Sequence, residues 1–313
     1  MYGRNYLSLL CFYGLLYKIL RRYGFSGNCS ALAVTVMLFV NVPLLRTLCY
    51  VQVNIHVANL ILLCLLLCKK RVFLSALALA VAVHMKSSPV ILVLPFILGK
   101  RWKWLIYFTV IMAGIVIWTS AMNGFEYYSN CLDNVRIIFL KTWACYRENS
   151  IDSFVRATLR LFLGRRVAAR FPILFLKAAL LLLSMMILFL NTKRKTYYRG
   201  NNGEAFIYNS FVVLIFLMMM FSPVVWEHHP VFIIFPFLLM LKKISGPGEL
   251  SIYLAAYYLI FLMPTFDFYP LSYNRLLGVV LCYVLFLKSL KSDAGSSVAF
   301  EKINRALEWR RES

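Results

Sequence analysis

Residues 222 to 230 read Ser-Pro-Val-Val-Trp-Glu-His-His-Pro, combine a carboxylate with two imidazoles, and lie between two apolar runs. A carboxylate (Glu227) beside two imidazoles (His228 and His229) has the groups needed to transfer protons or to hold a phosphate. The alternative is an interfacial turn, with Trp226 anchored at headgroup level and both imidazoles solvated. Because titratable groups at membrane depth are costly and usually face a polar cavity, the functional interpretation is favoured.

These two histidines are poor metal ligands as a pair. Adjacent residues do not project onto one helical face. No further histidine lies three or four positions from His228 or His229, as a helical ligand set would need. We therefore predict no metal site here.

Lys86 is the second candidate, because a lysine in the middle of an apolar run is unusual. Its ammonium could bind an anion such as a phosphate, or its side chain could extend to the membrane interface. Gln52 and Asn54 precede another apolar run. Their amides could hydrogen-bond to sugar hydroxyls or cap the next helix, and taken alone capping is favoured.

Arginines form the third set, and they lie between residues 120 and 170. Their guanidinium groups could hold a lipid phosphate by bidentate pairing. The alternative is attraction to anionic headgroups, worth about 1 kcal/mol per residue. The set comprises Arg147, Arg156, Arg160, Arg165, Arg166 and Arg170.

Membrane helices must position these side chains. Apolar residues make up 62% of the 313 residues, the mean hydropathy is +0.75, and charged residues reach only 15%, too few for a soluble domain. We predict an all-α, polytopic transmembrane bundle of about 9–11 membrane helices, some of them short or broken. The expected spans are 5–20, 29–48, 55–68, 72–99, 103–119, 171–191, 205–221, 230–241, 249–263 and 274–290.

The net charge is +22, and 14 of the 34 lysines and arginines lie in five short basic clusters between apolar runs. This is the positive-inside pattern of membrane proteins, and no soluble basic face for nucleic acid is visible. The clusters that we expect on the cytoplasmic side are residues 21–22, 69–71, 100–103, 193–199 and 242–243. The run 72–99 lies between two of them, so we expect a hairpin with its tip at residues 86–89.

The remaining connections then meet on the opposite, extracytoplasmic side. They include residues 51–54, the long loop 120–170 and residues 222–229. An apolar stripe along 151–164 predicts an amphipathic helix that lies in the interface. We expect residues 1–290 to form the transmembrane domain and residues 291–313 to form a cytoplasmic tail.

Four short stretches occur in an order that resembles glycosyltransferase family 87, which belongs to the C-type glycosyltransferase superfamily. They are Val-Gln-Val-Asn at 51–54, Lys-Ser-Ser-Pro at 86–89, Glu-Asn-Ser at 148–150 and Ser-Pro-Val-Val-Trp-Glu-His-His at 222–229. The resemblance covers roughly residues 40 to 240, and the last stretch is the specific one.

The resemblance implies a membrane enzyme that transfers a hexose, mannose first, from a polyprenyl-phosphate-sugar donor to a lipid or glycan acceptor with inversion. A lipid donor needs no nucleotide-binding fold and no cofactor, and the sequence has no Gly-rich phosphate loop. The resemblance assigns phosphate or sugar binding to His228, His229, Trp226, Lys86, Gln52, Asn54, Asn149, Ser150, Arg156 and Arg160.

Glu227 is the acidic residue that best fits the role of catalytic base implied by the resemblance. The family has its base, an Asp, in a first outer loop, whereas this chain has no acidic residue before Glu126. We therefore expect that the N-terminal span and that loop are missing. Two other functions stay open: an inactive, truncated relative, and a transporter or flippase of a lipid-linked or anionic solute.

Overall fold

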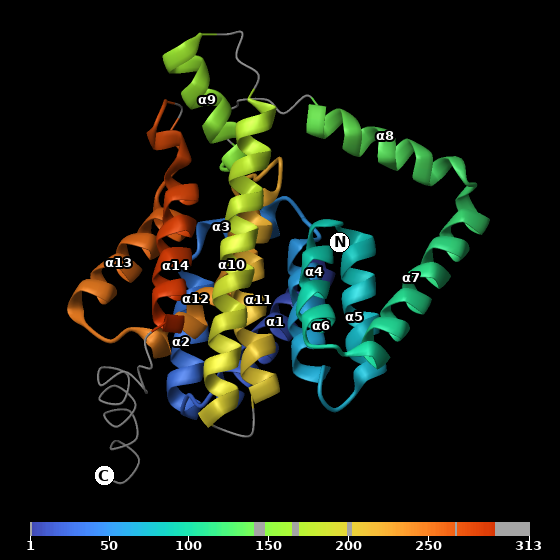
Figure 1. Cartoon of the computed structure of the whole chain (residues 1–313), viewed down its shortest axis with the longest axis horizontal. Coiled ribbons are helices and arrows are strands. Elements are labelled where there is room, and N and C mark those ends of the chain that lie inside the picture. Colours follow the sequence, from blue (N-terminus) through green and yellow to red (C-terminus); the bar gives the residue numbers. More distant parts are fainter. Residues whose placement is uncertain (1, 141–147, 165–168, 199–201, 267, 292–313) are drawn as a thin grey trace.

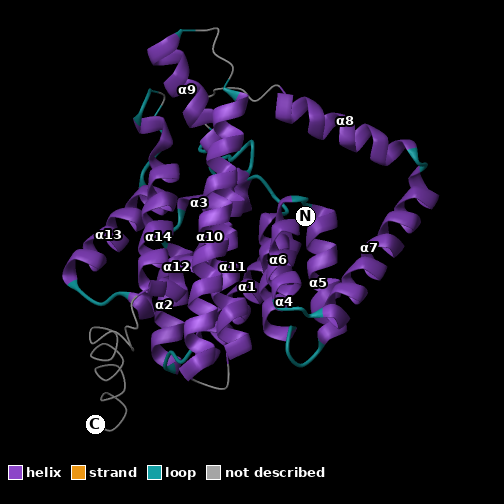
Figure 2. Ribbon diagram, in the orientation of Figure 1, coloured by secondary structure: helices purple, strands orange, loops and turns teal. Residues whose placement is uncertain are grey.

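The computed structural model describes residues 2–140, 148–164, 169–198, 202–266 and 268–291. Every regular element in these ranges is a helix, which confirms the all-α prediction (Figure 2). The elements are α1 (Tyr2–Arg22), α2 (Gly27–Phe39), α3 (Val42–Cys49), α4 (Asn54–Leu67), α5 (Val72–Met85), η1 (Ser88–Val93), α6 (Leu94–Leu98), α7 (Trp102–Asn123), α8 (Glu126–Leu140), α9 (Ile151–Leu163), α10 (Arg170–Tyr198), α11 (Asn202–Phe221), η2 (His229–Ile233), α12 (Ile234–Met240), η3 (Leu241–Lys243), α13 (Pro247–Tyr257), η4 (Tyr258–Leu262), η5 (Leu271–Tyr273) and α14 (Asn274–Lys291).

Each expected span coincides with one helix or with consecutive ones. By length and composition, three described helices can cross a membrane alone: Trp102–Asn123, Arg170–Leu190 and Leu271–Leu290. The pair α2 and α3 would form a fourth span, bent by 62°. The shorter apolar helices are Asn54–Leu67, Val72–Met85, Ser88–Leu98, Phe206–Phe221 and Pro247–Leu262.

Helix breaks have local causes in the sequence. Between α2 and α3, the Asn41 side chain accepts a hydrogen bond from the Leu44 amide at 2.8 Å, and Pro43 occupies the first turn of the new helix. After α5, Lys86 adopts an extended backbone, and Pro89 begins η1, which packs back against α5. The expected run 29–48 is thus two helices, and 72–99 turns at the expected tip.

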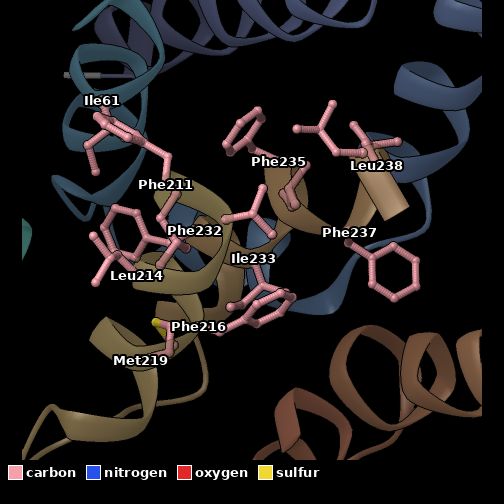
Figure 3. Packing of buried hydrophobic residues seen from close by; sticks show 14 of the residues in the cluster. Ile61, Phe211, Leu214, Phe216, Met219, Phe232, Ile233, Phe235, Phe237 and Leu238 are labelled. Carbon is pink, nitrogen blue, oxygen red and sulfur yellow. The ribbon is translucent and has the colours of Figure 1, made fainter. Parts of the chain in front are cut away.

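The core is built around α11 and α12. All seven residues of α12 are buried, as is nearly the whole of α11 from Ile207 to Met220. Figure 3 shows Phe211, Leu214 and Phe216 of α11 beside the η2–α12 segment. A helix that is apolar all round belongs at the centre of a bundle, so these two elements form the support on which the surrounding helices pack.

The segment expected as a loop from 120 to 170 holds two helices. Helix α8 was not predicted, whereas α9 covers nearly the range expected for the amphipathic helix. Figure 1 shows α7 leaning away from the bundle, with α8 at the upper right running from its end back toward the bundle. Trp104 is the only buried residue of α7, and its ring stacks on that of Phe96 with the ring centroids 3.7 Å apart.

Candidate functional site

The turn after α11 positions the carboxylate and the two imidazoles. The His229 amide donates to the Trp226 carbonyl at 3.0 Å, and the Trp226 amide donates to His229 Nδ1 at 3.2 Å. Because Nδ1 accepts this bond, the neutral imidazole carries its proton on Nε2. The Thr47 hydroxyl of α3 donates to the His228 carbonyl at 3.0 Å, which fixes the turn against α3.

Two arginines hold Glu227. Arg46 of α3 forms an ion pair with Oε2, and Nη1 of Arg275 in α14 lies 3.7 Å from Oε1. The Arg46 side chain is 41% exposed, whereas that of Arg275 is 1% exposed. Arg275 also donates to the Thr265 hydroxyl and to the Met263 carbonyl. Both carboxylate oxygens therefore have a guanidinium neighbour.

Lys86 brings a third cation to the same region. Its Nζ donates to Asn54 Oδ1 at 3.0 Å and lies 5.2 Å from the ring centroid of Phe232. Burial lowers the pKa of Lys86 to about 8, so the group is mostly charged at neutral pH. The buried amide nitrogen of Asn54 has no hydrogen-bond partner among the described residues.

The imidazole of His228 lies among these charges. Its ring centroid is 4.7 Å from that of His229 and 6.1 Å from that of Tyr50. Burial lowers the pKa of His228 to about 4, the charge of Lys86 acts in the same direction, and Glu227 opposes both. At neutral pH this imidazole is therefore an uncharged hydrogen-bonding group.

The stretch 148–150 closes the site from another side. The backbone N–H of Asn149 donates to the Val225 carbonyl at 2.9 Å. The side-chain Oδ1 of Asn149 accepts from the backbone N–H of Arg275 at 3.2 Å. Ser150 caps α9 by accepting from the Ser153 amide, and its hydroxyl donates to a carbonyl of the 222–229 turn. The cavity between Asn149, Val225 and Arg275 is only about 10 Å³, so the base of the site is tightly packed.

A comparison with models of protein families identifies the family of this chain. The model of glycosyltransferase family 87 matches residues 4–223. The chain belongs to glycosyltransferase family 87. The match confirms the resemblance and makes the chain a membrane protein of a glycosyltransferase family. It begins well before residue 40, and it ends ahead of Glu227 and the two histidines.

No curated protein and no solved structure matches the chain. Among the described residues, no group of three or more His, Cys, Asp or Glu side chains could hold a metal ion.

The structure brings most of the candidate residues of this family 87 chain together. Hydrogen bonds and ion contacts link Asn54 to Lys86, and they link the turn at 222–229 to α3, α14 and Asn149. Gln52 adjoins the cluster, because its backbone N–H donates to the carbonyl of Thr47 in α3 at 3.0 Å.

Three candidates lie apart or at the rim. Trp226 is 43% exposed, and Arg160 is exposed on α9. Arg156 is half-buried, and its buried Nε has no hydrogen-bond partner among the described residues. Arg147, Arg165 and Arg166 fall outside the described residues, and Arg170 is exposed at the start of α10.

Arg46 and Arg275 were not among the residues chosen from the sequence. Both lie inside or at the edge of apolar runs expected to cross the membrane, where a charge is costly and usually functional. That rule selected Lys86 and would have selected these arginines too. The Asp152–Lys177 ion pair between α9 and α10 was also missed as a pair, because its two residues lie 25 positions apart.

Proposed function

We propose that this family 87 protein transfers a hexose, mannose first, from a polyprenyl-phosphate-sugar donor to a lipid or glycan acceptor. Transfer takes place on the extracytoplasmic face of the cell membrane and inverts the anomeric carbon. The observation that carries the proposal is the convergence of Arg46, Arg275 and Lys86 around the 222–229 turn.

The charge balance of this cluster suits a lipid phosphate. Among the described side chains, Arg46 and Arg275 pair with Glu227, and the charge of Lys86 acts on the neighbouring His228, so the cluster carries excess positive charge. When the bond between the sugar and the phosphate breaks, negative charge develops on the phosphate. Fixed cations in a site of low dielectric stabilise that charge without reorganisation. The neutral imidazole of His228 is available to hydrogen-bond either the phosphate or the sugar.

A groove beside the cluster supports a donor with a long apolar chain. A cavity of about 770 Å³ lies between α1 and α4. Asn59 Nδ2 of α4 donates to the Ser8 hydroxyl and carbonyl of α1 along the cavity wall. Met85, which precedes Lys86, lines the cavity too. An isoprenoid chain in this groove would therefore lead toward the ammonium of Lys86.

The basic clusters support the proposed orientation. At the end of the bundle away from the site, Arg22 donates to the Leu66 carbonyl and Lys242 donates to the Tyr23 carbonyl. By the positive-inside rule this basic end faces the cytoplasm, and the site faces the other side.

The test uses purified protein in liposomes with polyprenyl-phosphate-[¹⁴C]mannose, and with GDP-[¹⁴C]mannose as the comparison. We expect label to pass covalently to an acceptor from the lipid donor only. Lys86→Met should weaken donor binding at least tenfold, because it removes a partly buried cation. Lys70→Met, at an exposed turn between α4 and α5, is the matched control.

Two results would contradict the proposal. One is movement of the labelled lipid across the vesicle membrane without covalent transfer, which would indicate a transporter. The other is wild-type donor affinity in Lys86→Met.

A further inference from the structure

Glu148 lies in the site, but the proposed function gives it no role. It is 5% exposed, and its Oε2 is buried without a hydrogen-bond partner among the described residues. A buried carboxylate oxygen normally has a partner, and leaving it without one is costly. An orphaned acceptor of this kind marks a place where a donor from a ligand fits.

The next residue supplies the complementary group. Asn149 is also buried, and its Nδ2 has no hydrogen-bond partner among the described residues. A hydroxyl is both a donor and an acceptor. Two adjacent residues thus offer what one ligand hydroxyl requires: an oxygen that accepts its proton and an N–H that donates to its oxygen.

Backbone hydrogen bonds place Glu148 and Asn149 beside the 222–229 turn and its cations. The backbone N–H of Asn149 donates to the carbonyl of Val225, which lies two residues before Glu227. The side-chain Oδ1 of Asn149 accepts from the backbone N–H of Arg275. Glu227 differs from Glu148 because its oxygens face Arg46 and Arg275. Oε2 of Glu227 is engaged by Arg46 and its Oε1 lies 3.7 Å from Arg275, whereas Oε2 of Glu148 has no hydrogen-bond partner among the described residues and can accept a proton.

The electrostatic surroundings of Glu148 suit proton transfer near neutral pH. Burial raises the pKa of Glu148 to about 7, and the negative charge of Asp152 acts in the same direction. A general base is most effective when its pKa lies near the working pH. The other charged groups of this wall are Asp152 and Arg156 of α9, Lys177 of α10 and Arg275 of α14, and Asp152 is paired with Lys177.

We propose that Glu148, rather than Glu227, takes the proton from the acceptor hydroxyl, and that Asn149 orients this hydroxyl. The inference rests on the proposed function and adds its proton acceptor. The acceptor O–H bond breaks, and the proton goes to Glu148. The electron pair left on the oxygen forms the new bond to the anomeric carbon. The bond from that carbon to the phosphate oxygen breaks, its electron pair leaves with the polyprenyl phosphate, and Glu148 then releases its proton to water.

The experiment compares Glu148→Gln, Glu148→Asp and Glu227→Gln in the liposome transfer assay, with Glu126→Gln on α8 as the exposed control. In Glu148→Gln we expect donor affinity to stay within about twofold of wild type, which shows that the site is folded. The transfer step should slow by about 10²–10⁴-fold, the usual contribution of a general base. The wild-type rate should rise with pH up to about 7, this rise should be absent in Glu148→Gln, and Glu148→Asp should restore part of it.

The outcomes separate the two proposals. If the wild type transfers sugar and Glu148→Gln transfers it at the same rate with the same pH profile, the role of Glu148 is overturned and the proposed function stands. The same holds if Glu227→Gln alone abolishes the acidic limb of the profile. If the wild type transfers no sugar from the lipid donor, the proposed function fails, and the role of Glu148 fails with it.

Discussion

The arrangement of two arginines around Glu227 predicts very unequal ion pairs. Both guanidinium groups contact the same carboxylate, but the Arg275 side chain is 1% exposed and the Arg46 side chain is 41% exposed. Solvent screens the exposed pair and hardly reaches the buried one. Replacing each arginine by methionine, alone and with Glu227→Gln, measures the two couplings in the same protein.

The distances give the expected magnitudes. At 3.7 Å and an effective dielectric constant of about 20, the attraction between Arg275 and Glu227 is about 4 kcal/mol before desolvation. Removing one partner of a buried pair costs about 3–5 kcal/mol. Arg275 keeps its bonds to Thr265 and Met263 in the variant, so we expect Glu227→Gln to cost about 3 kcal/mol, the low end of that range. The coupling of Arg46 to Glu227 should be below about 1 kcal/mol, as in exposed pairs.

Reversible unfolding in mixed micelles of a mild detergent and SDS, followed by tryptophan fluorescence, provides the free energies. The double-mutant cycle should give a coupling of about 2 kcal/mol for Arg275 with Glu227, and a smaller value for Arg46. Equal couplings, or a larger one for Arg46, would refute the reasoning, because burial would then not control the strength of these pairs.

Three further predictions concern separate parts of the molecule. Free Lys86 has a pKa of about 8, and a bound phosphate holds it charged, so donor affinity should fall as pH rises from 8 toward 10. Equilibrium binding should show this fall in the wild type and not in Lys86→Met. Gly14 has open space beside α1, so Gly14→Leu should narrow the groove and weaken binding of a long-chain donor several-fold, but not of a short-chain analogue. Gly114→Leu on α7, also in open space, should leave both affinities unchanged. Asn41→Ala removes the cap of α3 and a bond to the Met37 carbonyl, so the same unfolding assay should show a loss of about 1–2 kcal/mol.

The architecture could be predicted from the sequence wherever apolar runs and turn residues decide the structure. The ten apolar runs coincide with helices, and the tip of the 72–99 hairpin falls at Lys86, where an extended backbone follows α5 and Pro89 lies at the start of η1. Helix α8 was missed because Glu126–Leu140 mixes Tyr, Ser, Asn, Asp and Arg with its apolar residues, which gave no apolar run to find. The division at Asn41 was also missed, although an N-cap residue followed two positions later by proline is a recognisable start signal.

The site was harder to predict because it depends on pairing between distant residues. The topology expected from the basic clusters suggested that Asn54, Lys86 and Asn149 meet the turn at 222–229, and hydrogen bonds or charge contacts connect them. No sequence pattern shows that Glu227 lies between Arg46 and Arg275, since 181 and 48 positions separate it from them. That pairing is also what directs attention from Glu227 to Glu148, and it arises only when α3 and α14 both lie beside the 222–229 turn.

The helix breaks and the polar site coincide for a physical reason. A helix that ends inside the bundle leaves carbonyl groups without their usual partners, which is tolerated at membrane depth only where polar groups or a water-filled cavity satisfy them. Polar and charged side chains in and around this site do so: Arg275 donates to the Met263 carbonyl, Asn274 to that of Pro264 and Lys177 to that of Phe221. Ser150 and Thr47 do the same for Pro223 and His228. The charged side chains thus stabilise the broken helices, and the breaks hold those side chains at one end of the bundle. Variants of these residues should therefore alter folding and ligand binding together.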